Sequence, residues 1–135
     1  MARFHENYVN DSGAAAAPEG LKLDFAMTGK GSSRALATIN SYFQGWPGIV
    51  QGGILTTMMD EAMGVAVEDI LERNVFTVEL TTDFKEPALV GVELVVSGQV
   101  REILGLTATA YGEVRRKADN ALLTIGHGRY VLMKD

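Results

Sequence analysis

The chain contains no cysteine, and histidine occurs only twice, as His5 and His127. Without cysteine the protein can form no disulfide, offers no thiolate nucleophile and cannot build a zinc site from sulfur ligands. A zinc site built from histidine is disfavoured as well, because the two imidazoles lie far apart in the sequence. The sequence therefore predicts a protein without a bound metal, and the lack of cysteine is compatible with a reducing compartment.

Positive charge is also scarce, since 12 lysines and arginines stand against 17 acidic residues and give a formal net charge of -5. A general nucleic-acid-binding protein normally presents a basic face, so this balance argues against such a partner. No apolar run approaches the roughly 20 residues that span a bilayer. Polar residues follow Arg3 where the apolar region of a secretory signal would begin. We therefore expect a cytoplasmic protein with neither a nucleic-acid nor a membrane partner.

A chain of 135 residues is long enough for one hydrophobic core and too short for two. Residues 1–17 show no sustained period and include Asp11-Ser12-Gly13 and an alanine run. This composition is typical of an arm or irregular cap. We expect such a segment over residues 1–17, followed by a single folded domain over residues 18–135.

The periodicity of apolar residues predicts one helix and several strands. Between residues 53 and 73, apolar side chains recur at spacings of three and four, which indicates a helix that is apolar around most of its circumference. We expect the polar end of this helix, Glu68 to Arg73, to emerge into solvent. Alternating segments, which are typical of half-buried strands, occupy residues 21–27, 34–41, 75–84, 92–100, 106–116 and 121–133.

One enclosed helix after two strands, followed by four meandering strands, predicts an α+β domain with the hot-dog architecture, in which a curled antiparallel sheet wraps around a long central helix. Small residues on the late strands would let the sheet curve strongly and approach the helix, namely Ala108, Ala110, Gly112, Gly126 and Gly128. A single curled sheet leaves edge strands that a second subunit commonly covers. We therefore expect a homo-oligomer, either a dimer or a dimer of dimers.

The most informative feature is the junction between a glycine-rich turn, residues 43–53, and the apolar helix that carries Asp60. Free backbone N–H groups at a helix N-terminus attract developing negative charge. A carboxylate inside an almost wholly apolar segment must be paired, hydrogen-bonded or functional. Together these features suggest a reaction at a carbonyl group.

The same residues resemble the hot-dog thioesterase superfamily, in particular its PaaI-type acyl-coenzyme A thioesterases. The segment Phe43-Gln44-Gly45-Trp46-Pro47-Gly48-Ile49-Val50-Gln51-Gly52-Gly53 through Asp60-Glu61-Ala62-Met63-Gly64 resembles the central family motif. Pro18 to Leu23 and Thr82 to Pro87 resemble the flanking segments. The family usually has histidine at the position of Gln51, and many members carry an amide side chain at the position of Gly45.

The resemblance implies a thioester hydrolase with Asp60 and Gly52 as the catalytic residues. In that mechanism the Gly52 backbone N–H polarises the thioester carbonyl, while Asp60 attacks it or activates a water molecule. No separate cofactor is implied, because coenzyme A is part of the substrate. Further candidates for substrate binding are Gln51, Gly53, Trp46, Thr57 and Gly64, and candidates for the coenzyme A phosphates are Arg101, Arg115 and Arg116.

Helix geometry adds a constraint on this mechanism. Eight residues at a rise of about 1.5 Å separate Gly52 from Asp60 by roughly 12 Å along one helix. One carbonyl cannot touch both groups, so the N–H and the carboxylate must come from two helices, most simply from antiparallel helices related by a two-fold axis. The dimer would then be required for catalysis.

Each candidate also has a plain structural interpretation. Asp60 could be a satisfied buried carboxylate, Gly52 and Gly53 could merely form the turn, Trp46 could simply pack, and Arg115 and Arg116 could belong to a charged hairpin. We interpret Glu61 as a solvent or interface residue. An alternative function is a non-catalytic acyl-coenzyme A binding or sensing module on the same fold, which the glutamine at position 51 and the glycine at position 45 favour.

Overall fold

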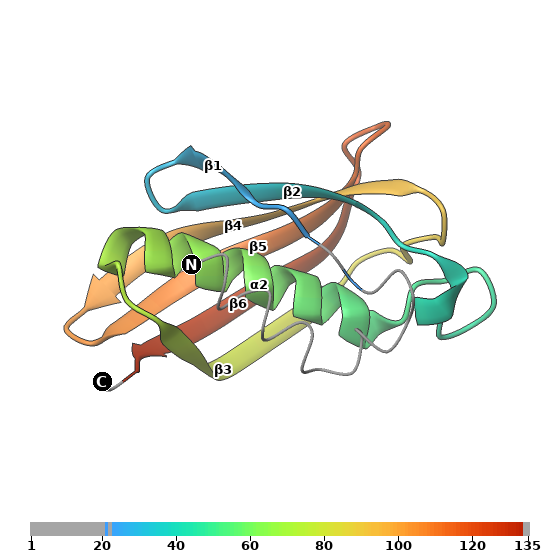
Figure 1. Cartoon of the computed structure of the whole chain (residues 1–135). Helices are drawn as coiled ribbons and strands as arrows, with labels where there is room; N and C mark the ends of the chain where they lie inside the picture. The colour runs from blue at the N-terminus through green and yellow to red at the C-terminus, as the bar shows by residue number, and fades with distance from the viewer. Residues whose placement is uncertain (1–20, 22, 134–135) are drawn as a thin grey trace.

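The computed structural model describes residue 21 and residues 23–133. The arm predicted over residues 1–17 lies outside this part of the chain. Within it, a six-stranded antiparallel sheet has the order β1 (Ala26–Gly29), β2 (Ser32–Thr38), β4 (Glu93–Leu104), β5 (Thr107–Arg116), β6 (Leu122–Leu132) and β3 (Val75–Phe84). The long helix α2 (Gly52–Leu71) lies across the concave face of this sheet (Figure 1). The predicted α+β hot-dog fold, with a curled sheet around a central helix, is confirmed.

The helices of the described chain are η2 (Ser41–Phe43) and α2 (Gly52–Leu71), and its strands are β1 (Ala26–Gly29), β2 (Ser32–Thr38), β3 (Val75–Phe84), β4 (Glu93–Leu104), β5 (Thr107–Arg116) and β6 (Leu122–Leu132). The first strand begins at Ala26 and not at residue 21 as predicted. Leu21 and Leu23 are buried, as the alternation indicated, but they lie in irregular backbone ahead of the strand. The expected strand over residues 34–41 ends early, since the Asn40 side chain accepts a hydrogen bond from Tyr42 N and starts the 3-10 turn.

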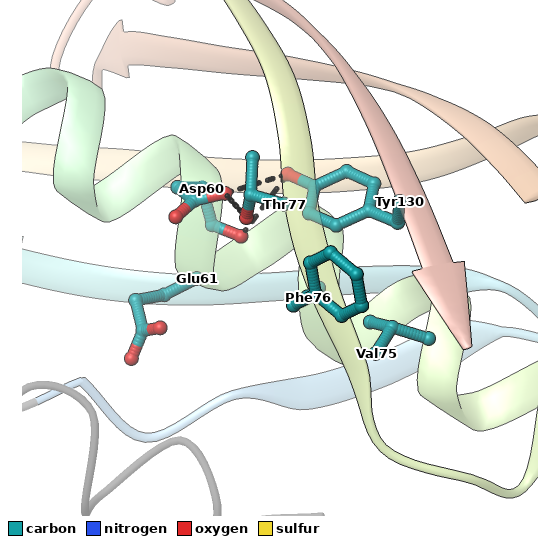
Figure 2. Close-up of a pocket in the computed structure, with 7 residues that line it drawn as sticks. Asp60, Glu61, Val75, Phe76, Thr77 and Tyr130 are labelled. Atoms are coloured by element: carbon teal, nitrogen blue, oxygen red, sulfur yellow. Dashed lines mark hydrogen bonds between the residues drawn. The ribbon is translucent and has the colours of Figure 1, made fainter. Parts of the chain in front are cut away.

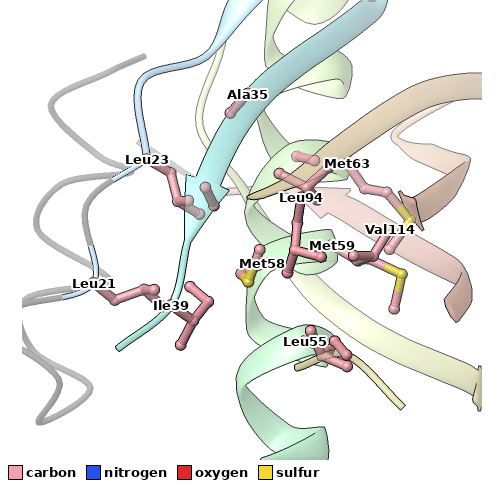
Figure 3. Close-up of a cluster of buried hydrophobic side chains, with 14 of the residues drawn as sticks. Leu21, Leu23, Ala35, Ile39, Leu55, Met58, Met59, Met63, Leu94 and Val114 are labelled. Carbon is pink, nitrogen blue, oxygen red and sulfur yellow. The ribbon is translucent and has the colours of Figure 1, made fainter. Parts of the chain in front are cut away.

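The hydrophobic core lies between α2 and the sheet (Figure 3). Met58, Met59 and Met63 are completely buried, as the apolar circumference of the helix predicts. Leu94 on β4 and Val114 on β5 face them across the interface. Because methionine is unbranched and flexible, it fills the irregular space that a curled sheet leaves against a helix.

Helix α2 touches the sheet backbone directly at Gly98 on β4. A Cβ atom at this position would lie 2.6 Å from the backbone nitrogen of Met63, closer than real Cβ contacts occur. Beside it, the buried hydroxyl of Ser33 on β2 donates a 2.7 Å hydrogen bond to the carbonyl oxygen of Ala62. This close approach fixes the height and rotation of the helix above the sheet, and thereby the direction in which its side chains point.

The C-terminal end of α2 corrects one expectation. Glu68 does not emerge into solvent, because its side chain is only 1% exposed and its Oε2 accepts a hydrogen bond from the backbone N–H of Val75 at 3.2 Å. A buried N–H at the start of a strand needs an acceptor. The Glu68 carboxylate supplies one and connects the helix to β3.

Strand β3 shows a second correction. Simple alternation along the sequence would place Phe76, Val78 and Leu80 on the same face of the strand. The pairing register with β6, however, shifts between Thr77 and Glu79, as at a β-bulge. The extra residue inverts the alternation before the shift. Val75 is therefore buried, and the hydroxyl of Thr77 reaches Asp60 on the helix although Thr77 is itself exposed, as are Phe76 and Val78.

The contact at Gly98 predicts that Gly98→Ala destabilises the protein by about 3 kcal/mol, since the obstructing atoms belong to the helix backbone and cannot rotate away. Chemical denaturation of both proteins measures this difference. Gly29→Ala is the matched control, because a Cβ on Gly29 meets nothing within 4 Å. Equal stability of the Gly98 and Gly29 variants would contradict the proposed close approach.

Candidate active site

A pocket opens beside the middle of α2, where the helix passes β3 and β6 (Figure 2). Its volume is about 270 Å³, and its lining residues are Asp60, Glu61, Gly64, Val75, Phe76, Thr77 and Tyr130. Asp60 is only 8% exposed. Its Oδ1 accepts one hydrogen bond from Thr77 Oγ1 at 2.8 Å and another from the Tyr130 hydroxyl at 2.8 Å.

The two oxygens of Asp60 are thus in different environments. Both hydroxyl donors reach Oδ1, whereas Oδ2 receives no hydrogen bond from any residue that the structure describes. Burial raises the pKa of Asp60 above its ordinary value, and the hydrogen bonds from Thr77 and Tyr130 oppose this effect. A carboxylate with a raised pKa and one unoccupied oxygen can accept a proton from water or attack an electrophile.

Glu61 also lines the pocket and is buried, which excludes the solvent role that the sequence allowed, whereas the interface role stays a prediction. Its carboxylate is directed away from the group formed by Asp60, Thr77 and Tyr130 (Figure 2). Gly64 lies one turn further along α2, and a Cβ there would meet nothing within 4 Å. The missing side chain therefore leaves that part of the pocket open.

The glycine-rich turn places Gln51 at the N-cap of α2, where the side chain caps no backbone N–H. Gly52 is the first helical residue, and within the described chain neither its N–H nor that of Gly53 donates to a backbone acceptor. The ring of Phe84 at the end of β3 lies against Gly52, since a Cβ there would be 3.1 Å from Phe84 Cζ. Among the described residues, the helix start thus presents N–H groups without a backbone acceptor beside an aromatic ring.

Two other predicted substrate-binding residues, Thr57 and Trp46, do not line the pocket around Asp60. The Thr57 hydroxyl donates to the Gly53 carbonyl oxygen at 2.9 Å. The threonine hydroxyl that donates to the Asp60 carboxylate is that of Thr77 on β3. Trp46 is 75% exposed at the tip of the turn and does not line the pocket of its own chain.

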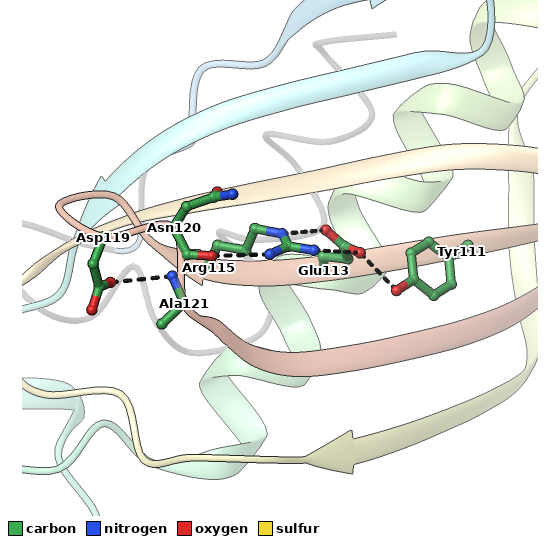
Figure 4. A network of polar contacts seen from close by, with 6 residues as sticks. All are labelled: Tyr111, Glu113, Arg115, Asp119, Asn120 and Ala121. Carbon is green, nitrogen blue, oxygen red and sulfur yellow. Dashed lines mark hydrogen bonds and ion pairs between the residues drawn. The ribbon is translucent and has the colours of Figure 1, made fainter.

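The three candidate arginines lie away from the pocket as well. Arg101 stacks over the Tyr111 ring at 4.6 Å, Arg115 forms an ion pair with Glu113 (Figure 4), and Arg116 forms one with Asp119. Burial acts to raise the pKa of Glu113, but the hydrogen bonds from Arg115 and Tyr111 outweigh it and lower the pKa. The role of these arginines in phosphate binding stays a prediction.

Thr77 and Tyr130 are the site residues that sequence reasoning missed. They are register partners on β3 and β6, so they meet only after the strands pair. Inverted alternation before the register shift concealed the inward direction of Thr77. One signal was available for Tyr130, because a tyrosine on the inward face of a strand needs a partner for its hydroxyl.

A family model described as the thioesterase superfamily matches residues 47–122, more than half of the 135-residue chain. The chain belongs to the thioesterase superfamily. The predicted resemblance is therefore confirmed. The matched range contains the glycine-rich turn from Pro47 onward, all of α2 and β3, and thus both Gly52 and Asp60.

Similar proteins agree with this assignment. The acyl-coenzyme A thioesterase THEM4 of Xenopus laevis is 27% identical over 109 residues, a match that covers 78% of this chain and 49% of that protein. The chain thus spans about half the length of this curated relative.

Solved structures show the same fold. The PaaI protein of the Escherichia coli phenylacetic acid degradation operon has a TM-score of 0.80 at 22% identity, with 96% of this chain and 90% of that chain covered. A hypothetical thioesterase from Streptococcus pneumoniae, solved with coenzyme A, has a TM-score of 0.78 at 11% identity, with 93% of this chain and 98% of that chain covered.

In the part of the chain that the structure describes, no helix combines the length and the apolar character of a membrane span.

The raised pKa of Asp60 predicts that Asp60→Asn stabilises the fold at pH 7–8, by a few degrees in Tm. A carboxyl group whose folded pKa lies above its unfolded value favours folding at low pH, and this contribution is lost as the pH rises through the folded pKa. Asparagine stays neutral, and its Oδ1 can still accept from Thr77 and Tyr130. Calorimetry from pH 4 to pH 8 should show a gain in Tm that shrinks as the pH falls, whereas a less stable variant at pH 8 would contradict this.

Proposed function

We propose that this member of the thioesterase superfamily hydrolyses a small or medium acyl- or aryl-coenzyme A thioester at the pocket around Asp60. The observation that carries the proposal is a buried carboxylate at the wall of a pocket, with one oxygen that accepts no hydrogen bond from the described residues. The name of the Xenopus relative and the coenzyme A in the Streptococcus structure support coenzyme A esters as the substrate class.

Asp60 can perform this hydrolysis in either of two ways. As a general base, Oδ2 removes a proton from water while the water oxygen bonds to the thioester carbon. The tetrahedral intermediate then expels the thiolate of coenzyme A, which takes up a proton, and a carboxylic acid is released. As a nucleophile, Oδ2 attacks the thioester carbon and expels the thiolate of coenzyme A, which takes up a proton, so that an anhydride forms between Asp60 and the acyl group. Water then hydrolyses the anhydride, which releases the carboxylic acid and regenerates Asp60. Both routes require the ionised carboxylate.

The Gly52 N–H is the proposed donor to the carbonyl oxygen, and we propose that it comes from the partner subunit. Gly52 and Asp60 lie on the same continuous helix, α2, about 12 Å apart along its axis. They therefore cannot contact one carbonyl within a single chain. An antiparallel second copy of α2 would place its own Gly52 beside Asp60 and complete two sites per dimer.

The edge strand β3 supports this arrangement. In the described chain β3 pairs only with β6, and it exposes Phe76 (47%) and Phe84 (51%). An open edge that carries large apolar side chains is suited to pairing with another chain. Pairing of β3 with its copy would continue the sheet across both subunits.

The proposed arrangement also implies a position for the two-fold axis. If Gly52 of each subunit faces Asp60 of the other, the axis passes level with the residue midway between them, Thr56. The Thr56 hydroxyl donates to Thr82 Oγ1 on β3 at 3.1 Å. The proposed axis would therefore lie at the level of Thr82 on β3, the strand whose outer edge we propose as the pairing edge.

We predict that the protein releases coenzyme A from acyl or aryl esters and that Asp60→Asn lowers kcat by roughly 10²–10⁴-fold. A thiol-release assay over a panel of coenzyme A esters measures both quantities. Circular dichroism and size-exclusion chromatography provide the control that fold and oligomer persist in the variant. Saturable binding without turnover in the wild-type protein would instead support the acyl-coenzyme A binding module.

The composite site predicts that inactive subunits complement each other. Gly52→Pro removes the N–H at a position where proline fits, because Gly52 is the first helical residue and Gln51 already has φ -59 and ψ 134. Loss of this donor should lower kcat by roughly 10²–10³-fold. After dissociation and reassociation in equal amounts with Asp60→Asn subunits, about one quarter of wild-type activity should return, since half of the dimers then hold one intact site.

Gly52→Ala is the matched control, because it keeps the N–H and adds only a Cβ atom 3.1 Å from the half-exposed Phe84 ring. It should retain most of the activity. A mixture of Asp60→Asn and Gly52→Pro subunits that stays inactive would show that the two groups do not act across subunits.

A further inference from the structure

We propose that Tyr130 is a positioning residue, which holds Asp60 as a carboxylate through Oδ1 and leaves Oδ2 turned toward the substrate. This inference rests on the proposed function of the pocket. The Tyr130 side chain is 1% exposed, and its hydroxyl lies 2.8 Å from Oδ1. The hydroxyl also donates to the backbone carbonyl oxygen of Asp60 at 3.4 Å, so it contacts both the side chain and the backbone of that residue.

The direction of the hydrogen bond follows from the acidity of the phenol. Burial and the negative charge of Asp60 both raise the pKa of Tyr130 far above its ordinary value. The phenol therefore keeps its proton at neutral pH. Opposite an ionised Asp60, Tyr130 must donate to Oδ1, and this donation favours the carboxylate over the neutral acid.

The absence of a side chain at Gly128 leaves the space that the ring of Tyr130 occupies. Residues 128 and 130 lie two apart on β6 and face the helix, and both are buried. A Cβ on Gly128 would lie 2.7 Å from Tyr130 Cε1 and 2.8 Å from the Tyr130 hydroxyl oxygen. The ring thus lies across the bare backbone of Gly128 to reach Asp60, and any larger residue at position 128 would displace it.

Few other charged groups act on Asp60 in the described chain. Strands β4 and β5 face α2 with residues that carry no charge: Leu94, Val96, Gly98, Ala108, Ala110, Gly112 and Val114. Strand β3 contributes the neutral Thr77, and β6 contributes Tyr130. On α2 itself, Glu61 is the acidic neighbour that shares the pocket. The hydroxyl of Tyr130 is therefore one of two groups that oppose the effect of burial on Asp60.

The test is the pH dependence of kcat in Tyr130→Phe, which keeps the ring and removes only the hydroxyl. Without this donor, burial protonates Asp60 at higher pH, and the acid limb of the profile should move toward neutrality. We expect kcat to fall roughly tenfold at the acid end of the profile and less than about threefold on the alkaline plateau. KM should change little, because Tyr130 acts through Asp60. A general loss of packing would lower kcat equally at every pH.

A second variant tests the same role with the phenol present. Gly128→Ala displaces the tyrosine ring and should move the acid limb in the same direction as Tyr130→Phe. Tyr42→Phe removes an exposed hydroxyl outside the pocket and should leave the profile unchanged. If the limb stays in place in both Tyr130→Phe and Gly128→Ala, or moves only in Glu61→Gln, Tyr130 does not position Asp60.

Carbon-13 NMR titration of the Asp60 carboxyl, assigned with Asp60→Asn, provides a measurement that needs no turnover. Titration at higher pH in Tyr130→Phe than in the wild-type protein would support the role of Tyr130 even if no coenzyme A ester were hydrolysed, in which case only the proposed function would fail. Turnover with an unchanged titration would retain the proposed function and overturn the role of Tyr130.

Discussion

The geometry of the candidate site depends on the contact between the backbone of α2 and the backbone of β4 at Gly98. Because no side chain separates them there, the helix cannot rotate or rise without losing the Ser33 hydrogen bond to Ala62. Ala62 is only two residues from Asp60 on the same helix. The contact at Gly98 on one side of α2 therefore directs Asp60 toward β3 and β6 on the other side. There the hydroxyl groups of Thr77 and Tyr130 donate to its carboxylate.

Strand β3 serves both the site and the edge of the sheet. Its register shift turns Thr77 toward Asp60, and Glu68 accepts the N–H at its first residue. The same strand leaves its outer edge unpaired within the described chain. A single subunit consequently offers a carboxylate at a pocket of about 270 Å³, smaller than the roughly 300–1,000 Å³ of most small-molecule sites. The proposed composite site, which a second copy of β3 and α2 would complete, accounts for this difference.

The sequence predicted those features that depend on local periodicity or on the glycine turn. The helix from Gly52 onward, Asp60 within it and the four late strands follow from spacing alone. Features that depend on pairing between distant segments were missed. Thr77 meets Tyr130 only in the β3–β6 register, and Glu68 was expected in solvent because its neighbours are charged. A carboxylate can be buried when it accepts a hydrogen bond from a buried backbone N–H. The periodicity of apolar residues carries no information about such a hydrogen bond.

Two carboxylates in this protein show why hydroxyl donors suit a reactive acid. Glu113 pairs with Arg115, a cation whose hydrogen bond helps to lower the pKa of Glu113 and makes it a weaker base. Asp60 has no cation in contact among the described residues, and its two donors are neutral hydroxyls. Its pKa consequently remains raised. Neutral donors fix the orientation of a carboxylate without neutralising its charge, so Asp60 is held in place and still keeps the basicity that the proposed attack on a carbonyl group requires.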